Sequence, residues 1–219
     1  MTTLHNADTT SESLSDRAYR VLLDQLIMLD IQPGEPIIEK QLADELGVGR
    51  TPLREALKRL ESDHLVVTYP RRGTFASQVD VTELAHVSEV RQALEPLAAR
   101  RAAEIHGGAM RQQLLGVLME LKSLNPNQSQ RDLLAYDLSV HRMIYRVTQN
   151  EHLSETLIRL DNIATRIWAA LSDRLPSLHE HIIEHTQLIK HIVAGEPDEA
   201  ERHAAEHVEN FYDMVRTAL

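Results

Sequence analysis

The chain has 219 residues, no cysteine and a formal net charge of −10 at neutral pH. The absence of cysteine excludes disulfide scaffolds, thiolate metal sites and cysteine nucleophiles. No apolar stretch is long enough to span a bilayer and residues 1–14 lack a hydrophobic signal core, so we expect a cytoplasmic protein with no membrane partner. Aromatic residues make up only 4%, which favours a mostly helical fold over strands.

The negative charge is concentrated in the C-terminal part. Residues 15–79 carry nine Lys and Arg against ten Asp and Glu, whereas residues 80–219 carry fourteen against twenty-one. Within the near-neutral part there is a basic set of the kind that nucleic-acid binding requires: Arg50, Arg54, Lys58, Arg59, Arg71 and Arg72. The overall acidity therefore does not exclude a DNA-binding N-terminal domain.

The first 78 residues divide into a polar arm and a domain. Residues 1–14 are rich in Thr, Ser and Asp, which predicts a disordered arm. Apolar residues at helical spacing predict helices over about 16–27, 39–46 and 50–62. Two strand-like runs, 65–69 and 74–77, flank turn residues and predict a hairpin. Helix, helix, turn, helix and hairpin over residues 15–78 indicate a winged helix-turn-helix domain.

Basic side chains occupy the positions that would meet DNA in such a domain. Arg50 and Arg54 lie in the first turn of the third helix, where the macrodipole disfavours cations, and this indicates an external anion. In this motif that end of the helix enters the major groove, where arginine contacts guanine or phosphate. Arg71 and Arg72 lie at the hairpin tip, and Gly73 allows a positive φ for close approach to the sugar-phosphate backbone. The alternative, a solvated basic face, explains a lone arginine pair but not this combination.

The remainder of the chain has helical periodicity throughout. Glycine, proline and asparagine interrupt it at regular places, which predicts helices over about 81–106, 110–123, 130–149, 151–174, 176–194 and 197–217. Because the connections are short, we expect one antiparallel six-helix bundle over residues 80–219.

Histidines and an aspartate in this bundle suggest a metal site. Asp137 and His141 are four residues apart and share a helix face, while His185 and His207 lie in apolar surroundings on two later helices. One Asp and three His suit zinc first, with nickel or manganese as alternatives, and leave coordination positions for water or a carboxylate. Spacing alone leaves open that these histidines are only hydrogen-bonded core or surface residues.

Two arginines with apolar neighbours are candidates for holding a carboxylate effector. Arg91 lies on the first bundle helix and Arg166 on the fourth, and either could point into a cavity. Arg91 could equally form a structural ion pair with Glu95, one turn further along.

An enzymatic alternative comes from two segments that fit the H-x-x-E-H pattern of zinc peptidases, His181 to His185 and His203 to His207. Such a pattern arises easily in helices rich in His and Glu, and a metal-dependent hydrolase would leave the winged domain unexplained. We therefore expect a protein that is not an enzyme. His181 and His203 still compete as ligands, because each lies one turn before a candidate ligand on the same face.

The segment IQPGEPIIEKQLADELGVGRTPLREALKRLESDHLVVTYPRRGTFA resembles the DNA-binding domain of GntR-family regulators, and the resemblance covers roughly residues 15–77. It implies that Gly73 is the wing-tip glycine. It also implies helix contacts to DNA from Lys40, Arg50, Thr51 and Arg54. Gly49 and Ile38 depart from the family, which commonly has serine caps there; each departure weakens a helix start by up to about 1 kcal/mol.

Residues 81–217 resemble the FCD ligand-binding domain of one GntR branch, in the segments YDLSVHRMIYRVTQN and EHTQLIKHIVAGEPDEAERHAAEHV. The helix count resembles the shorter, metal-containing subgroup. The resemblance implies metal ligands at Asp137, His141, His185 and His207. It further implies a small carboxylate effector against the metal, a homodimer on a two-fold symmetric operator, and repression that the effector relieves.

Overall fold

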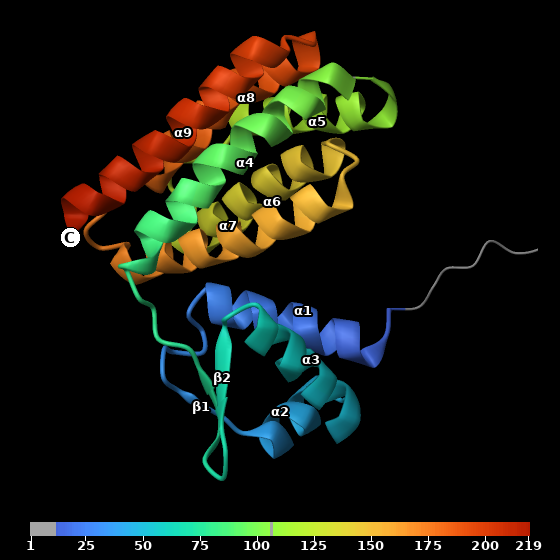
Figure 1. The fold of residues 1–219 in the computed structure, drawn as a ribbon, viewed down its shortest axis with the longest axis vertical. Helices are drawn as coiled ribbons and strands as arrows, with labels where there is room; N and C mark the ends of the chain where they lie inside the picture. Colours follow the sequence, from blue (N-terminus) through green and yellow to red (C-terminus); the bar gives the residue numbers. More distant parts are fainter. Residues whose placement is uncertain (1–11, 106) are drawn as a thin grey trace, which may run out of the picture. The chain divides into compact units, whose positions relative to one another are not determined.

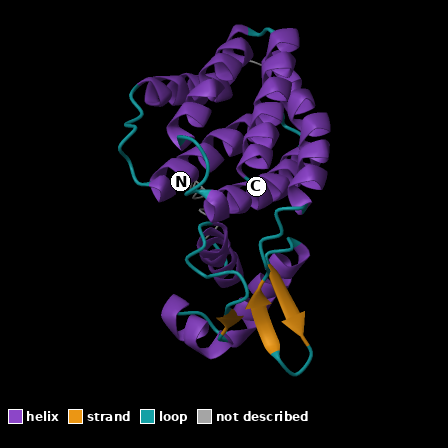
Figure 2. Ribbon diagram, turned by 90° about the vertical axis from the view of Figure 1, so that its left-hand side faces the viewer, coloured by secondary structure: helices purple, strands orange, loops and turns teal. Residues whose placement is uncertain are grey.

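The computed structural model describes residues 12–105 and 107–219. The predicted arm over residues 1–14 therefore lies almost entirely outside the described residues. The chain divides into two compact units between Gln78 and Val79, with Ile27–Leu29 grouped with the second unit. Within residues 12–105 and 107–219, strands occur only in the first unit, whereas helices make up most of both units (Figure 2). None of the described helices is both long and apolar enough to cross a membrane.

The first unit is the predicted winged helix-turn-helix. Its elements are α1 (Leu14–Ile27), β1 (Pro36–Ile37), α2 (Glu39–Leu46), α3 (Arg50–Ser62), β2 (Val66–Tyr69) and β3 (Gly73–Ala76). The hairpin of β2 and β3 pairs antiparallel with Val67 opposite Phe75. The sequence did not predict β1, which pairs with the outer edge of β3 and gives the order β1-β3-β2. Two residues are too few to show the alternation that marks a strand.

The starts of α2 and α3 lack side-chain caps. Ile38 precedes α2 and Gly49 precedes α3, and neither side chain accepts a hydrogen bond from the helix. Gly47 ends α2 in the left-handed conformation, with φ 62°, and its N–H and the following residue bond back to the last turn. This turn allows the chain to reverse within three residues and begin α3.

The second unit is the predicted six-helix bundle. Its helices are α4 (Glu83–Ile105), α5 (Gly108–Lys122), α6 (Gln130–Val147), α7 (Glu151–Leu171), α8 (Leu178–Ala194) and α9 (Pro197–Ala218). Side-chain oxygens of Ser129 and Asn150 cap α6 and α7, and Pro197 begins α9. Helices α4 and α9 lie side by side (Figure 1). The mostly helical fold expected from the sequence is confirmed.

The interior of this bundle contains many ionisable groups beside its apolar core. The buried ones are Arg91, Glu95, Asp137, His141, Asp161, Arg166, His181, His185 and His207. Burying a charge is costly unless the charge is paired or bound to a ligand, so a core that only stabilised the fold would not need this set. The polar interior of the bundle is therefore the candidate location for a ligand-binding site.

Candidate functional site

The four predicted metal ligands come together from three helices. Asp137 and His141 lie on α6, His185 on α8 and His207 on α9. One ring nitrogen from each histidine lies within 4.8 Å of the other two. Asp137 Oδ2 is 3.9 Å from His141 Nε2, and its Oδ1 is 3.7 Å from His185 Nδ1. The four side chains named from the family resemblance thus share one buried location.

The Nδ1 atom of each of the three rings has a polar partner. The pairs are His185 with the Ile182 carbonyl at 3.0 Å, His141 with Tyr145 Oη at 3.1 Å, and His207 with Glu184 Oε2 at 3.2 Å. Because a carbonyl only accepts, Nδ1 of His185 carries the hydrogen and Nε2 keeps the lone pair. Partners of this kind orient metal-ligating histidines in proteins.

Atoms that face the centre of the cluster are under-satisfied. Asp137 Oδ1 and His207 Nε2 have no hydrogen-bond partner among the described residues. Nε2 of His141 lies 3.0 Å from Nε2 of His185. A buried polar atom without a partner costs about 1–3 kcal/mol. Three imidazoles with ring nitrogens within 4.8 Å of one another, and a carboxylate within 4 Å of two of these rings, make a donor set that fits a divalent ion such as zinc.

Burial also sets the protonation states that ligation requires. It lowers the pKa of His141 and His207 well below the ordinary value, and that of His185 to about 4. The imidazoles are therefore neutral near pH 7, the form that binds metal. Burial raises the pKa of Asp137 well above its ordinary value, so the carboxyl needs a positive partner to ionise.

The competing histidines are placed differently from each other. His181 is buried and stacks on His207, with ring centroids 4.4 Å apart. His203 instead stacks on His191 at 4.8 Å, and these two form a separate, more exposed group with Glu199. Among the described residues, neither H-x-x-E-H segment places both of its histidines in one potential metal group. The geometry of a zinc peptidase is not reproduced.

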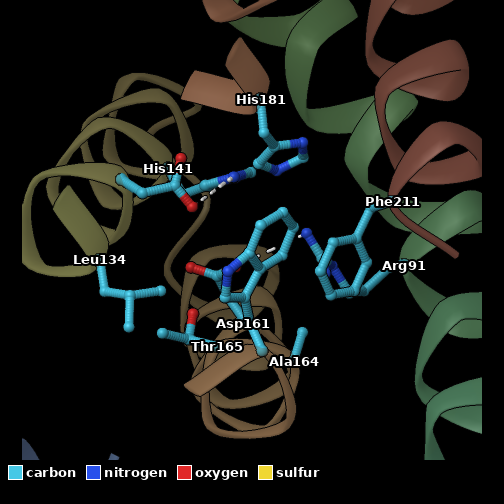
Figure 3. A pocket seen from close by; sticks show the side chains of 10 residues that line it. Arg91, Leu134, His141, Asp161, Ala164, Thr165, His181 and Phe211 are labelled. Carbon is cyan, nitrogen blue, oxygen red and sulfur yellow. Dashed lines mark ion pairs between the residues drawn. The ribbon is translucent and has the colours of Figure 1, made fainter. Parts of the chain in front are cut away.

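A small cavity adjoins the cluster (Figure 3). It is lined by Arg91, Leu134, Asp137, His141, Asp161, Ala164, Thr165, Trp168, His181 and Phe211. Two of the predicted ligands, Asp137 and His141, therefore border this cavity. The enclosed space is small, about 10 Å³, which is room for about one water molecule, so a small organic ligand would need the lining side chains to move apart.

Arg91 has both of the contacts considered from the sequence. It lines the cavity, and its Nε donates to Glu95 Oε1 within a buried ion pair. Its Nη2 also lies 3.6 Å from Asp161 Oδ1. Arg166 is buried on α7 but is not one of the residues that line the cavity. Its assignment to effector binding stays a prediction.

Sequence reasoning missed Asp161, which lies on α7. Its side chain is 3% exposed, and burial raises its pKa to about 7. Oδ2 has no hydrogen-bond partner among the described residues. A signal was present in the sequence, because Asp161 lies four residues after Leu157 and four before Thr165, on the face of α7 that is buried.

In the first unit, the predicted DNA contacts all lie on its surface. They are Lys40 on α2, Arg50, Thr51 and Arg54 on the start of α3, and Arg71, Arg72 and Gly73 in the hairpin. Arg54 Nε lies 2.8 Å from Glu39 Oε2, which joins the starts of the two helices. Gly73 has the expected positive φ, 96°, and Arg71 has a positive φ of 66° that the sequence did not predict.

The structure corrects one member of the basic set. Arg59 lies 2.6 Å from Asp16, and its guanidinium stands 3.9 Å above the ring of Tyr19. It therefore connects α3 to α1 and does not belong with the arginines at the start of α3. Counting basic residues could not separate Arg59 from the arginines at the start of α3, because a count does not show which side chains each arginine contacts.

A winged helix-turn-helix with a basic third helix, followed by a helical bundle with a polar interior, defines a class of DNA-binding proteins with a second, helical domain. Residues 14–76 match the model of the bacterial regulatory proteins of the gntR family, and residues 86–210 match the FCD domain. The chain therefore belongs to the GntR family, in the branch with an FCD domain. It is a DNA-binding transcriptional regulator.

Named relatives agree with this assignment, and a solved structure shares the fold. The HTH-type transcriptional repressor RspR of Escherichia coli is 23% identical over 94% of this chain and 90% of its own length. The probable D-xylose utilization operon transcriptional repressor of Paenarthrobacter nicotinovorans is 27% identical over 92% and 90%. The structure of E. coli McbR/YncC matches with a TM-score of 0.81 at 23% identity, over 94% of this chain and 98% of that one.

Proposed function

We propose that this regulator is a repressor that binds operator DNA as a homodimer and is released by a small carboxylate bound beside a divalent metal ion, with zinc as the favoured ion. The observation that carries the proposal is the convergence of Asp137, His141, His185 and His207 at the edge of a buried cavity. The sensing site and the DNA-reading helix then lie in separate units of the chain.

Asp137 and the three histidines would hold the ion. The support is their donor chemistry, the unpartnered Asp137 Oδ1 and His207 Nε2, and the Nδ1 partners that orient the rings. A divalent ion there supplies positive charge and open coordination positions for a carboxylate. Arg91 is the arginine that lines the cavity, so it is the candidate to contact the effector. Its guanidinium already faces two carboxylates, Glu95 and Asp161.

The repressor assignment has its support in the relatives that are named as repressors. Lys40, Arg50, Thr51 and Arg54 would contact the major groove, with Arg71, Arg72 and Gly73 at the wing. Effector binding would change operator affinity by about 1–3 kcal/mol, the usual range for coupling between sites. A hydrolase gains no support from the geometry, since His181 and His185 do not share a potential metal group.

Metal content tests the site directly. We expect purified parent protein to hold about one divalent ion per chain, and His185→Ala and His207→Ala each to lose most of it, because loss of one ligand of four removes a large share of the affinity. The matched control is His203→Ala, which removes a histidine from the same helix as His207 but from outside the cluster. Elemental analysis after dialysis gives the stoichiometry.

His181→Ala distinguishes the register of the site. His181 lies one turn before His185 and stacks on His207, so it is the replacement ligand if the proposed set is wrong. A parent without stoichiometric metal would contradict the proposal. Loss of metal in His181→Ala together with retention in His185→Ala would move the site one helical turn along α8.

A further inference from the structure

Asp161 and Thr165 form a polar wall of the cavity that the metal site does not use. Both lie on α7, four residues apart, and both line the same space as Asp137 and His141. Figure 3 shows them beneath His141, on the side of the cavity near Ala164. Asp161 Oδ2 is buried and lacks a hydrogen-bond partner among the described residues, so a carboxyl oxygen is available within this wall. A buried acceptor without a partner is stabilised when a ligand group donates a hydrogen bond to it.

The charges around this wall disfavour a second anionic group on the ligand. Arg91 is the cation of the cavity, and it already faces two carboxyl groups, Glu95 on its own helix and Asp161 across from it. Its guanidinium is further enclosed by the ring of Phe211, 5.3 Å away. One arginine between two acids leaves no excess positive charge for another carboxylate.

We infer that Asp161, assisted by the Thr165 hydroxyl, is a second recognition point that selects effectors carrying a hydroxyl or ammonium group in addition to a single carboxylate. The inference rests on the proposed function, which places that carboxylate beside Asp137 and His141. It excludes dicarboxylates as preferred ligands. A carboxyl group accepts a hydrogen bond from either donor, so the two ligand types share one chemistry.

A matched set of four-carbon acids tests this with the full-length, metal-loaded chain. The probes are butanoate, its 2-, 3- and 4-hydroxy derivatives, 4-aminobutanoate and butanedioate, with Kd values measured by calorimetry. We expect at least one donor-bearing acid to bind about tenfold or more tightly than butanoate, because a buried hydrogen bond to a charged group contributes at about that level. Butanedioate should bind no more tightly than butanoate. Hydroxy and amino acids in separate arms show which donor the wall accepts.

The measured quantity is the Kd of butanoate divided by the Kd of the tightest donor-bearing acid. In Asp161→Ala this ratio should fall to about one. Asp161→Asn keeps an acceptor oxygen and the side-chain shape, so it should retain part of the ratio if the alanine variant folds poorly. The control is Asp173→Ala, an exposed acid beyond the end of α7, which should keep the parent ratio. Metal content is measured on every variant.

Equal binding of butanoate and its derivatives, tightest binding of butanedioate, or an unchanged ratio in Asp161→Ala would each overturn the inference while leaving the proposed function standing. A parent that holds metal but binds none of the acids would overturn it together with the effector part of the proposed function. A parent without metal would overturn it together with the metal site itself.

Discussion

Arg50 and Arg59 lie on the same helix and differ in what surrounds them. Arg59 is held by Asp16 and the ring of Tyr19, whereas Arg50 is exposed at the start of α3. A cation at a helix N-terminus is disfavoured by the helix dipole. We therefore expect any stabilising contact of Arg50 to be with a group outside the molecule.

Arg50→Ala should therefore weaken operator binding by about 1–3 kcal/mol. Arg59→Ala should change operator binding by less than about 1 kcal/mol, because it breaks an exposed intramolecular pair. Fluorescence anisotropy at one salt concentration, with an operator selected from random DNA, gives both values. Parent-like affinity in Arg50→Ala would contradict its assignment to DNA.

The buried imidazoles make the metal-free protein sensitive to acid. Burial lowers the folded-state pKa of His141, His181, His185 and His207, so below about pH 6.5 the unfolded chain binds more protons than the folded one. Their contribution to stability is full above pH 6.5 and is lost as the pH falls. For His185, with a folded pKa of about 4, the loss between pH 7 and pH 5 is about 2 kcal/mol.

Asp137 and Asp161 act in the opposite direction, since burial raises their pKa values. The four imidazoles outnumber them, so we expect the urea midpoint of chelator-treated protein to be lower at pH 5 than at pH 7. Asp161→Asn removes one opposing group and should enlarge the difference. A midpoint that rises at pH 5 would show that the acids dominate.

The family resemblance supplied the four candidate ligands, whose metal binding stays a prediction, and the sequence did not predict the side chains around them. Asp137 and His141 share a face by spacing alone, and helical period places His185 in an apolar pattern. The contact of Arg91 with Asp161 joins α4 to α7, and it depends on how each helix is rotated in the bundle. Sequence spacing carries no information on that rotation.

At the scale of elements, two glycines should respond in opposite directions to alanine. Gly73 has φ 96°, and a Cβ there would meet no atom within 4 Å, so Gly73→Ala should lose about 1 kcal/mol through backbone strain alone. Gly116 lies inside α5 with open space around it, so Gly116→Ala should gain about 0.5–1 kcal/mol from helix propensity. Thermal unfolding measures both. Equal changes in melting temperature for the two variants would mean that the positive φ of Gly73 does not determine the loss of stability in Gly73→Ala.

Some element boundaries were predictable from a chemical stop, whereas the starts predicted at residues 110 and 176 are at Gly108 and Leu178 in the structure. Gly47 ends α2, and Asn150 begins α7 with a side-chain cap. In contrast, β1 exists only because β3 offers an edge to Pro36 and Ile37. A strand that depends on its partner leaves no pattern in its own residues.

At the scale of the whole molecule, α4 offers a surface for the proposed dimer. His86, Val90, Ala93 and Leu97 are exposed and follow one another along one helical stripe, with Val90 and Leu97 42% and 43% exposed. One winged domain reads too short a site for high specificity, so two are expected to act together. The parent should sediment as a dimer.

Leu97→Glu should shift the full-length chain toward monomer, because it places a charge within this stripe. Met119→Glu is the matched control, since Met119 is a 67% exposed apolar residue on α5. Sedimentation velocity distinguishes the species. A Leu97→Glu protein that stays dimeric would remove α4 from the interface.

The contact between His141 and His185 links occupancy of the cluster to the tautomer of His141, whose ring hydrogen can lie on either Nε2 or Nδ1. Since Nδ1–H of His185 donates to Ile182, the hydrogen between the two Nε2 atoms belongs to His141, whose Nδ1 must then accept from Tyr145. Ligation through both Nε2 atoms would move that hydrogen to Nδ1 and turn the Tyr145 hydroxyl toward another acceptor, with Glu95 within its reach. Occupancy of the cluster would thus reverse the hydrogen bond between His141 Nδ1 and the Tyr145 hydroxyl, and nitrogen chemical shifts of His141 would report it.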